Sequence, residues 1–199
     1  LGPLSTNAYL LVDEEAGRGV VIDPGQRPEP LLRRIVDLRI EAIVLTHAHF
    51  DHIGGVEAVR KAKGCPVYLH DAEADWLTDP KLNGSLMWPE VGGPVQTAPA
   101  ELALDEGMEL KLLGETFRVF HTPGHSPGSV SLLYGDKLFC GDVLFRLSVG
   151  RTDLPGGSSR ELLESIHGKL FELPDDVKVY PGHGPSTTIG FEKANNPYV

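Results

Sequence analysis

Short apolar runs bounded by turn residues alternate along the chain with stretches of helical periodicity. Residues 8–12 and 19–23 are two such runs, separated by Glu15-Ala16-Gly17, and they predict a β-hairpin. Residues 29–39 place apolar side chains at helical spacing and predict a helix. We expect a further helix over residues 51–59. The first quarter of the chain therefore predicts strands interleaved with helices.

The same alternation continues to the end of the chain. A strand is predicted over 66–70, a short helix over 71–78, and mainly strands from 109 to 145. Ser158 or Ser159 is expected to cap a helix near 160–171. Alternation of this kind predicts an α/β protein in which mixed sheets are covered by helices. No composition shift or linker divides the chain, so we expect a single domain over residues 1–199.

One six-residue block, His47-Ala48-His49-Phe50-Asp51-His52, carries four side chains able to bind a metal ion. It follows the apolar run Ala42–Leu45, which reads as a buried strand. Side chains alternate at a strand end, so His47 and His49 should point the same way. A core histidine bonded to backbone would explain one of these residues, but not three histidines and an aspartate. Four ligands in six residues predict a metal site. They are too many for one tetrahedral ion, which suggests a second ion.

Three further apolar runs also end in residues that can bind metal. Phe117–Phe120 leads to His121 and His125, and the runs 137–140 and 177–180 lead to Asp142 and His183. The triplet Pro-Gly-His occurs at both His125 and His183, and its glycine permits a sharp turn. Sites in open α/β sheets form beyond the carboxyl ends of strands. We therefore expect these strand ends to converge.

These blocks resemble those of the metallo-β-lactamase superfamily, in the branch of glyoxalase II and its relatives. The resemblance runs nearly end to end and rests on seven blocks. They are 4–9 (LSTNAY), 21–25 (VIDPG), 47–52, 122–129 (TPGHSPGS), 141–145 with 150–153 (GDVLF, GRTD) and 181–185 (PGHGP). The resemblance implies a four-layer αββα sandwich of two mixed sheets flanked by helices.

The resemblance also implies a ligand set for two ions. One ion would take His47, His49 and His125, the other would take Asp51, His52 and His183, and Asp142 would bridge both. Two divalent ions are expected, zinc first, with iron or manganese as alternatives. A hydroxide shared by the ions would attack a carbonyl carbon, and Asp51 would also orient it.

The resemblance implies a metal-dependent hydrolase that acts on small thioesters of the hydroxyacyl-glutathione type. One alternative is a persulfide dioxygenase with a single iron on His47, His125 and Asp142, since such enzymes share a Gly-Arg-Thr-Asp block. A lactonase or another hydrolase of this fold is a third interpretation, because the same hydroxide would serve.

Charge and hydrophobicity limit the classes of partner that the chain is expected to bind. The chain has 199 residues, 41% of them hydrophobic, and a formal net charge of −10, which argues against a nucleic-acid partner. No apolar run is long enough to span a bilayer, so no membrane partner is expected. Cys65 and Cys140 predict two buried thiols in a cytoplasmic protein and no disulfide. The sequence leaves the oligomeric state open.

Several remaining residues have simpler interpretations. His70 is expected to bond to backbone, His121 to be structural, and His167 to lie on the surface of a helix. The resemblance makes Asp23 a buried residue that orients a metal ligand. Arg151 and Asp153 predict either a local ion pair or support for the site. In the loop 83–89, Met87 and Trp88 are predicted to form a flap that touches substrate.

Overall fold

The computed structural model describes all residues, 1–199, and its contacts divide the chain into two compact units. The first unit holds residues 1–103 and 112–114, and the second holds residues 104–111 and 115–199. Each unit is built on its own mixed β-sheet with helices packed on it. The predicted α/β class, with two mixed sheets flanked by helices, is confirmed. The single-domain organisation stays a prediction.

The sheet of the first unit has five strands in the order β1-β2-β3-β4-β5. Its strands are β1 (Tyr9–Asp13), β2 (Arg18–Ile22), β3 (Arg39–Val44), β4 (Val67–His70) and β5 (Leu102–Leu104). The predicted hairpin is confirmed, since β1 and β2 pair antiparallel. Strands β2, β3 and β4 then pair parallel, so the sheet is mixed. The carboxyl ends of β2 and β3 consequently meet at one edge, where the first ligand block begins.

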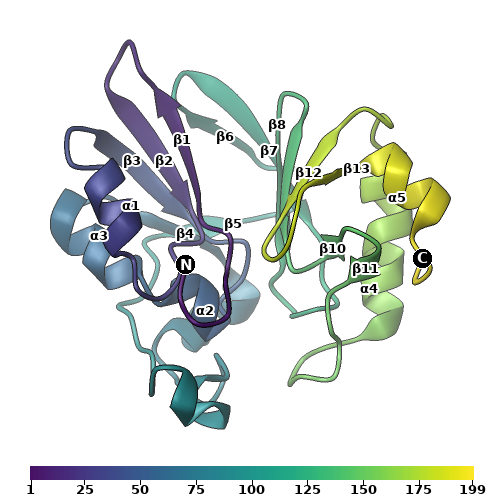
Figure 1. Ribbon diagram of the computed structural model, residues 1–199, viewed down its shortest axis with the longest axis horizontal. Helices are drawn as coiled ribbons and strands as arrows, with labels where there is room; N and C mark the ends of the chain where they lie inside the picture. Colours follow the sequence, from purple (N-terminus) through teal and green to yellow (C-terminus); the bar gives the residue numbers. More distant parts are fainter. The chain divides into compact units, whose positions relative to one another are not determined.

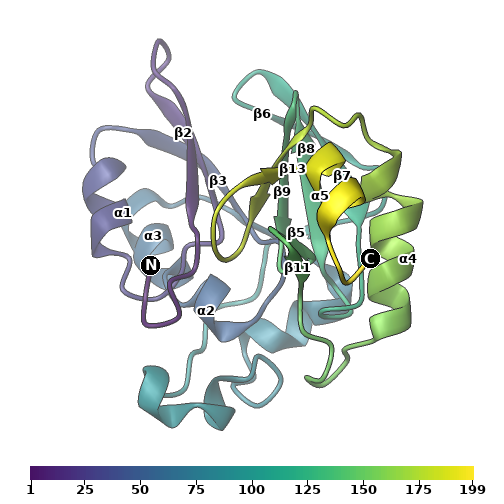
Figure 2. The same cartoon turned by 45° about the vertical axis from the view of Figure 1, so that its right-hand side comes forward.

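Helices α1 (Glu29–Arg34) and α3 (Val56–Lys63) lie side by side along one face of this sheet (Figures 1 and 2). Their apolar residues Leu31, Val56 and Val59 join a buried cluster with Ile43 and other strand residues. The short α2 (Phe50–Ile53) and three 3-10 turns complete the unit. The turns are η1 (Asp71–Leu77), η2 (Ser85–Met87) and η3 (Pro89–Val91).

Two predicted helices of this unit differ from the expected bounds: one is shorter, and the other is divided in two and continues to Lys63. The helix predicted over 29–39 ends at Arg34, because Arg39 already pairs with Arg18 in the sheet. The helix predicted over 51–59 is interrupted at Gly54 and Gly55. The interruption fits a close approach of the loop after β2: a Cβ at Gly55 would lie 2.6 Å from the carbonyl oxygen of Gly25.

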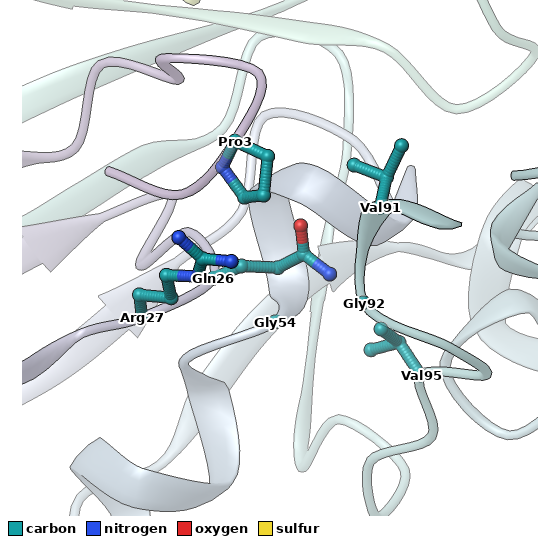
Figure 3. Close-up of a pocket in the computed structure, with 7 residues that line it drawn as sticks. All are labelled: Pro3, Gln26, Arg27, Gly54, Val91, Gly92 and Val95. Atoms are coloured by element: carbon teal, nitrogen blue, oxygen red, sulfur yellow. The ribbon is translucent and has the colours of Figure 1, made fainter. Parts of the chain in front are cut away.

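Gly54 shows the same close approach at the neighbouring position. A Cβ there would lie 2.4 Å from Cγ of Gln26, whose side chain runs across Gly54 in Figure 3. Gln26 also lines a hollow of about 280 Å³, together with Pro3, Arg27, Gly54, Val91, Gly92 and Val95. The glycine pair therefore lets the ligand-bearing α2 sit directly on the loop that follows β2.

The sheet of the second unit has six strands in the order β13-β12-β9-β8-β7-β6. Its strands are β6 (Glu109–Leu112), β7 (Glu115–His121), β8 (Val130–Tyr134), β9 (Lys137–Gly141), β12 (Lys178–Pro181) and β13 (Thr187–Thr188). Strands β7, β8 and β9 pair antiparallel, whereas β9 and β12 pair parallel. A small ribbon of β10 (Leu144–Phe145) and β11 (Ser148–Val149) follows β9.

Helices α4 (Ser159–Gly168) and α5 (Ile189–Asn195) lie on the same side of this sheet in both views (Figures 1 and 2). Leu162, Ile166 and Ile189 pack with strand residues such as Leu138 and Val179 in one buried cluster. The predicted cap of α4 is Ser158, whose side chain accepts the backbone N–H of Glu161. The helix ends at Gly168, and the predicted residues to 171 belong partly to the 3-10 turn η4 (Leu170–Glu172).

Candidate metal centre

Four of the seven predicted ligands lie in the first unit, at the junction of β3 and α2. His47, His49, Asp51 and His52 are all buried. The ring centroids of His47 and His52 are 4.1 Å apart, and those of His47 and His49 are 4.9 Å apart. The ligand atoms of His47, His52 and Asp23 lie within 4.8 Å of one another. The block therefore brings its three imidazoles close together.

Hydrogen bonds fix which ring nitrogen of His47 and His52 carries a proton. The Thr46 hydroxyl donates to Asp23 Oδ2 at 2.6 Å, so toward His47 Nδ1, 3.1 Å away, it can only accept. His52 Nδ1 donates to the same Asp23 Oδ2 at 2.9 Å. In the neutral rings Nδ1 therefore carries the proton and Nε2 keeps its lone pair. This is how a protein prepares histidine to bind a metal.

Asp23 is the residue on which this arrangement depends. It is the first residue after β2 and has a left-handed backbone conformation (φ 49°), which costs a non-glycine residue about 1–2 kcal/mol. Its carboxylate accepts the backbone N–H of Thr46 at 2.8 Å in addition to the two side-chain bonds. The orienting role implied for Asp23 is thus visible in its contacts.

Glu73 is a part of the site that sequence reasoning missed. Its side chain is 0% exposed, and it accepts the backbone N–H of Ala48 at 2.5 Å. Ala48 lies between His47 and His49, so this bond constrains both imidazoles. A kink within η1, at Glu73 itself (φ −122°, ψ 16°), accompanies the inward turn of the side chain. The only sequence signal was an acidic residue on an otherwise buried face of a short helix.

The other three predicted ligands, His125, Asp142 and His183, lie in the second unit at the ends of β7, β9 and β12. His125 Nε2 is 3.6 Å from Asp142 Oδ2, and His183 Nε2 is 3.5 Å from the same oxygen. His125 Nδ1 donates to the carbonyl oxygen of Arg151 at 2.8 Å, which again leaves the lone pair on Nε2. Two imidazoles thus flank one carboxylate oxygen.

Two glycines allow this close packing in the second unit. Gly124, with φ 137°, precedes His125, and a Cβ there would lie 2.2 Å from the backbone nitrogen of Leu162 in α4. A Cβ at Gly150 would lie 1.8 Å from the carbonyl oxygen of Asp142. Any side chain at these positions would displace a ligand or the backbone that carries it.

Within each unit, neighbouring ligand atoms are separated as expected for two ligands of a common divalent ion. His52 Nε2 is 3.5 Å from Asp51 Oδ2, which repeats the separations around Asp142 in the second unit. These distances exceed the range of about 2.7–3.2 Å for a good hydrogen bond. Ligands about 2.0–2.2 Å from a tetrahedral ion are themselves about 3.3–3.6 Å apart. Imidazole and carboxylate are also the donors that zinc and iron accept.

The ion pair of Arg151 and Asp153 is present, and Arg151 serves the site through its backbone. Arg151 Nε donates to Asp153 at 2.7 Å, and both side chains are exposed. The hydrogen bond from Arg151 lowers the pKa of Asp153 to about 2. The same bond raises the pKa of Arg151. Since the carbonyl oxygen of Arg151 holds His125, both interpretations of this pair are in part correct.

The remaining histidines have the structural roles that the sequence suggested. His70 Nδ1 accepts the backbone N–H of Ala72, His121 Nε2 contacts the carbonyl oxygen of Pro127 at 2.8 Å, and His167 is exposed on α4. In the predicted flap, Met87 is exposed and Trp88 packs 5.8 Å from Phe50 between ring centroids. Contact of this loop with substrate stays a prediction.

Both cysteines are free and buried, as predicted, and burial raises the pKa of Cys65. Among the helices of the structure, not one has the length and apolar character needed to cross a membrane.

The chain is similar in sequence to bacterial metallo-hydrolases. It is 42% identical over 203 residues to the probable metallo-hydrolase YqgX of Bacillus subtilis (strain 168), covering 100% of this chain and 94% of that protein. It is 36% identical over 199 residues to the hydroxyacylglutathione hydrolase GloC of Haemophilus influenzae, covering 97% of this chain and 92% of that protein.

Solved structures share the fold along the whole chain. The crystal structure of the BLEG-1 B3 metallo-β-lactamase is 51% identical with a TM-score of 0.93, covering 100% of this chain and 96% of that one. TTHA1623 in a di-iron-bound form is 43% identical with a TM-score of 0.86, covering 100% and 98%. ETHE1 from Myxococcus xanthus is 32% identical with a TM-score of 0.78, covering 98% and 79%.

The sequence pattern of the metallo-β-lactamase superfamily matches residues 1–183, a span that includes every ligand position from His47 to His183. The matches in sequence and structure agree with the two mixed sheets and with the histidine and aspartate side chains at their edges. The chain therefore belongs to the metallo-β-lactamase superfamily.

Proposed function

We propose that this protein is a divalent-metal-dependent hydrolase that cleaves thioesters of the hydroxyacyl-glutathione type. The observation that carries the proposal is the orientation of three imidazole rings by hydrogen bonds within the protein. His47, His52 and His125 each direct Nδ1 to an internal acceptor and keep the Nε2 lone pair for a metal. Family membership supports hydrolysis, and the relative GloC, by its name, supports the thioester class.

In the ligand assignment that we propose, the seven residues bind two ions, as the family resemblance implies. Asp142 is the shared ligand, with His47, His49 and His125 on one ion and Asp51, His52 and His183 on the other. Zinc is the proposed metal, and iron or manganese are alternatives. The di-iron form of TTHA1623, at 43% identity, supports two ions in a chain of this kind.

The residues of the chain hold and orient the reacting groups. Bound divalent ions supply hydroxide at neutral pH and positive charge for the developing oxyanion. Asp51 is proposed to orient the attacking water as well as to bind metal. Asp23 and Glu73 hold the ligand backbone and the His52 ring in place, so little reorganisation is needed when substrate binds. A thiolate leaving group departs without a proton because its pKa is only about 8.5.

The test is hydrolysis of a hydroxyacyl-glutathione thioester without oxygen. We expect turnover under anaerobic conditions, loss of activity with a chelator, and recovery with added Zn²⁺ or Mn²⁺. The matched control is His167→Ala, which removes an exposed histidine of α4 outside the ligand set and should leave turnover unchanged. Absence of thioester cleavage by the metal-loaded protein would refute the proposal.

Two other reactions have specific support and are measured in the same preparation. A persulfide dioxygenase is suggested by the Gly150–Asp153 block and by the likeness to ETHE1. It would consume oxygen in proportion to a thiol persulfide. It would leave Asp51, His52 and His183 without an obvious task, although burying unused polar groups costs free energy. The 51% identity with the BLEG-1 B3 metallo-β-lactamase structure supports a β-lactam as the substrate instead, and a β-lactam added to the assay tests for that reaction.

The proposed substrate is a small molecule. The cytoplasmic location and the lack of nucleic-acid or membrane partners stay predictions, and the oligomeric state is open.

A further inference from the structure

A threonine from the start of the chain contacts the metal-ligand block of the first unit. Thr6 is only 1% exposed, and its hydroxyl donates to Asp51 Oδ2 at 2.7 Å. The turn that carries Thr6 is closed by backbone bonds from Thr6 N–H to Leu1 O and from Ser5 N–H to Gly2 O. Gly2 and Ser5 both adopt positive φ, which brings the turn round tightly. The turn is therefore a defined element that presents one hydroxyl to Asp51.

The direction of this bond follows from chemistry. An ionised carboxylate only accepts hydrogen bonds, so the Thr6 hydroxyl must be the donor. Bonds of this kind, from a neutral hydroxyl to a charged oxygen, are about twice as strong as neutral ones. The terminal torsion of an aspartate is otherwise broad, so a free carboxylate samples many orientations. The Thr6 bond therefore selects one orientation of the Asp51 carboxylate.

In that orientation, the Asp51 carboxylate and the His52 ring are separated as two ligands of one metal ion are. In it, Asp51 Oδ2 lies 3.5 Å from His52 Nε2, the separation expected of two ligands on one ion. His52 is itself held by Asp23 through Nδ1. Asp51 and His52 are thus each fixed by a buried polar residue from a distant part of the chain, one by a hydroxyl and the other by a carboxylate.

We propose that Thr6 is a positioning residue for the Asp51 ligand, and that its hydroxyl sets the affinity of one of two metal ions. This inference rests on the proposed function, because it assumes that Asp51 binds metal. Thr6 does not touch the reacting atoms. Its hydrogen bond fixes the orientation of the Asp51 carboxylate before the ion binds, so metal binding does not have to order that carboxylate.

The test is a Zn²⁺ titration of the metal-free chain of residues 1–199, with Zn²⁺ alone and a competing chelator dye. Thr6→Val keeps the shape of the side chain and removes the hydroxyl, whereas Thr6→Ser keeps the hydroxyl. We expect Thr6→Val to weaken one of the two zinc sites by about 10–100-fold, the usual effect of losing a residue that orients a ligand. The other site should keep its affinity, and Thr6→Ser should restore most of the loss.

Thr187→Val is the matched control. Thr187 is also a buried threonine that donates to a buried carboxylate, that of Glu192, outside the ligand set. We expect Thr6→Val and Thr187→Val both to lower the melting temperature, because each removes a buried hydrogen bond, but Thr187→Val should leave both zinc affinities unchanged. Thr6→Ala supplies a second chain without the hydroxyl if Thr6→Val does not fold.

The outcomes separate the inference from the proposed function. A wild-type chain that binds no zinc in this titration, and no iron or manganese when each is titrated in the same way, would refute the proposed function itself. A wild-type chain with two zinc ions, together with unchanged affinities in Thr6→Val and Thr6→Ala, would refute only the role of Thr6. In that case the hydroxyl merely anchors the turn. Selective loss of one site, with recovery in Thr6→Ser, supports the inference.

Discussion

The substitution Gly150→Ala gives a sharp test of how the second unit holds its ligands. A Cβ at this position would lie 1.8 Å from the carbonyl oxygen of Asp142 and 3.2 Å from Cβ of His125. Carbon and oxygen atoms ordinarily approach to about 3.3–3.6 Å, so the two backbones must separate by about 1.5 Å. The atom in the way is backbone, which cannot rotate aside as a side chain can.

The loss of stability caused by Gly150→Ala has two contributions. Overpacking of this kind costs about 1–3 kcal/mol. The bond from Gly150 N–H to the carbonyl oxygen of Val143, 3.2 Å long, would be lost for about 1 kcal/mol more. We therefore expect the free energy of unfolding to fall by about 3 kcal/mol. For a chain of this size that corresponds to a melting temperature about 6–12 °C lower.

The same displacement should abolish tight metal binding by the ligands of the second unit. Asp142 Oδ2 lies 3.6 Å and 3.5 Å from the Nε2 atoms of His125 and His183, and metal–ligand distances tolerate changes of only about 0.2 Å. Calorimetric melting with and without Zn²⁺ measures both effects, because bound metal raises the melting temperature. In Gly150→Ala we expect the increase caused by Zn²⁺ to be mostly lost.

Gly168→Ala is the matched control for this experiment. A Cβ at Gly168, the last residue of α4, meets no atom within 4 Å. The same chemical change should therefore leave zinc binding intact and alter stability by no more than about 1 kcal/mol, in the stabilising direction. If Gly150→Ala matched Gly168→Ala in melting temperature and zinc affinity, the packing argument would be wrong.

Further predictions concern the ligands and the groups that hold them. Asp142→Ala should weaken both metal sites, whereas His183→Ala should empty one, as metal analysis after dialysis will show; two tightly held ions in Asp142→Ala would contradict the bridging role. Glu73→Ala leaves a buried backbone N–H without its acceptor and should lower the free energy of unfolding by about 2–5 kcal/mol in urea melts; an unchanged midpoint would argue against this. Arg151→Leu removes the hydrogen bond that depresses the pKa of Asp153, so the carboxyl midpoint measured by NMR should rise from about 2 towards 3.8. A midpoint that stays near 2 would exclude Arg151 as the cause.

Much of the fold could be predicted from the sequence because its signals are local. The hairpin of β1 and β2 follows from two alternating runs and a turn between them, and the cap of α4 follows from Ser158. Helix lengths were less predictable. The helix predicted over 29–39 is cut short where strand pairing takes over at Arg39, and periodicity alone cannot report a pairing partner.

The sequence by itself determined the chemistry of the candidate site, because imidazole and carboxylate side chains at strand ends can be read directly. The tertiary structure alone decided how those side chains are held. Thr6 reaches Asp51 across 45 residues, and Glu73 reaches Ala48 across 25. The carbonyl oxygen of Arg151, a group present in every residue, fixes the His125 ring. Gly54 and Gly55 interrupt a helix next to a loop that comes close to them, although the helical pattern runs through them. Such contacts depend on which distant segments meet, and no local pattern of residues encodes that.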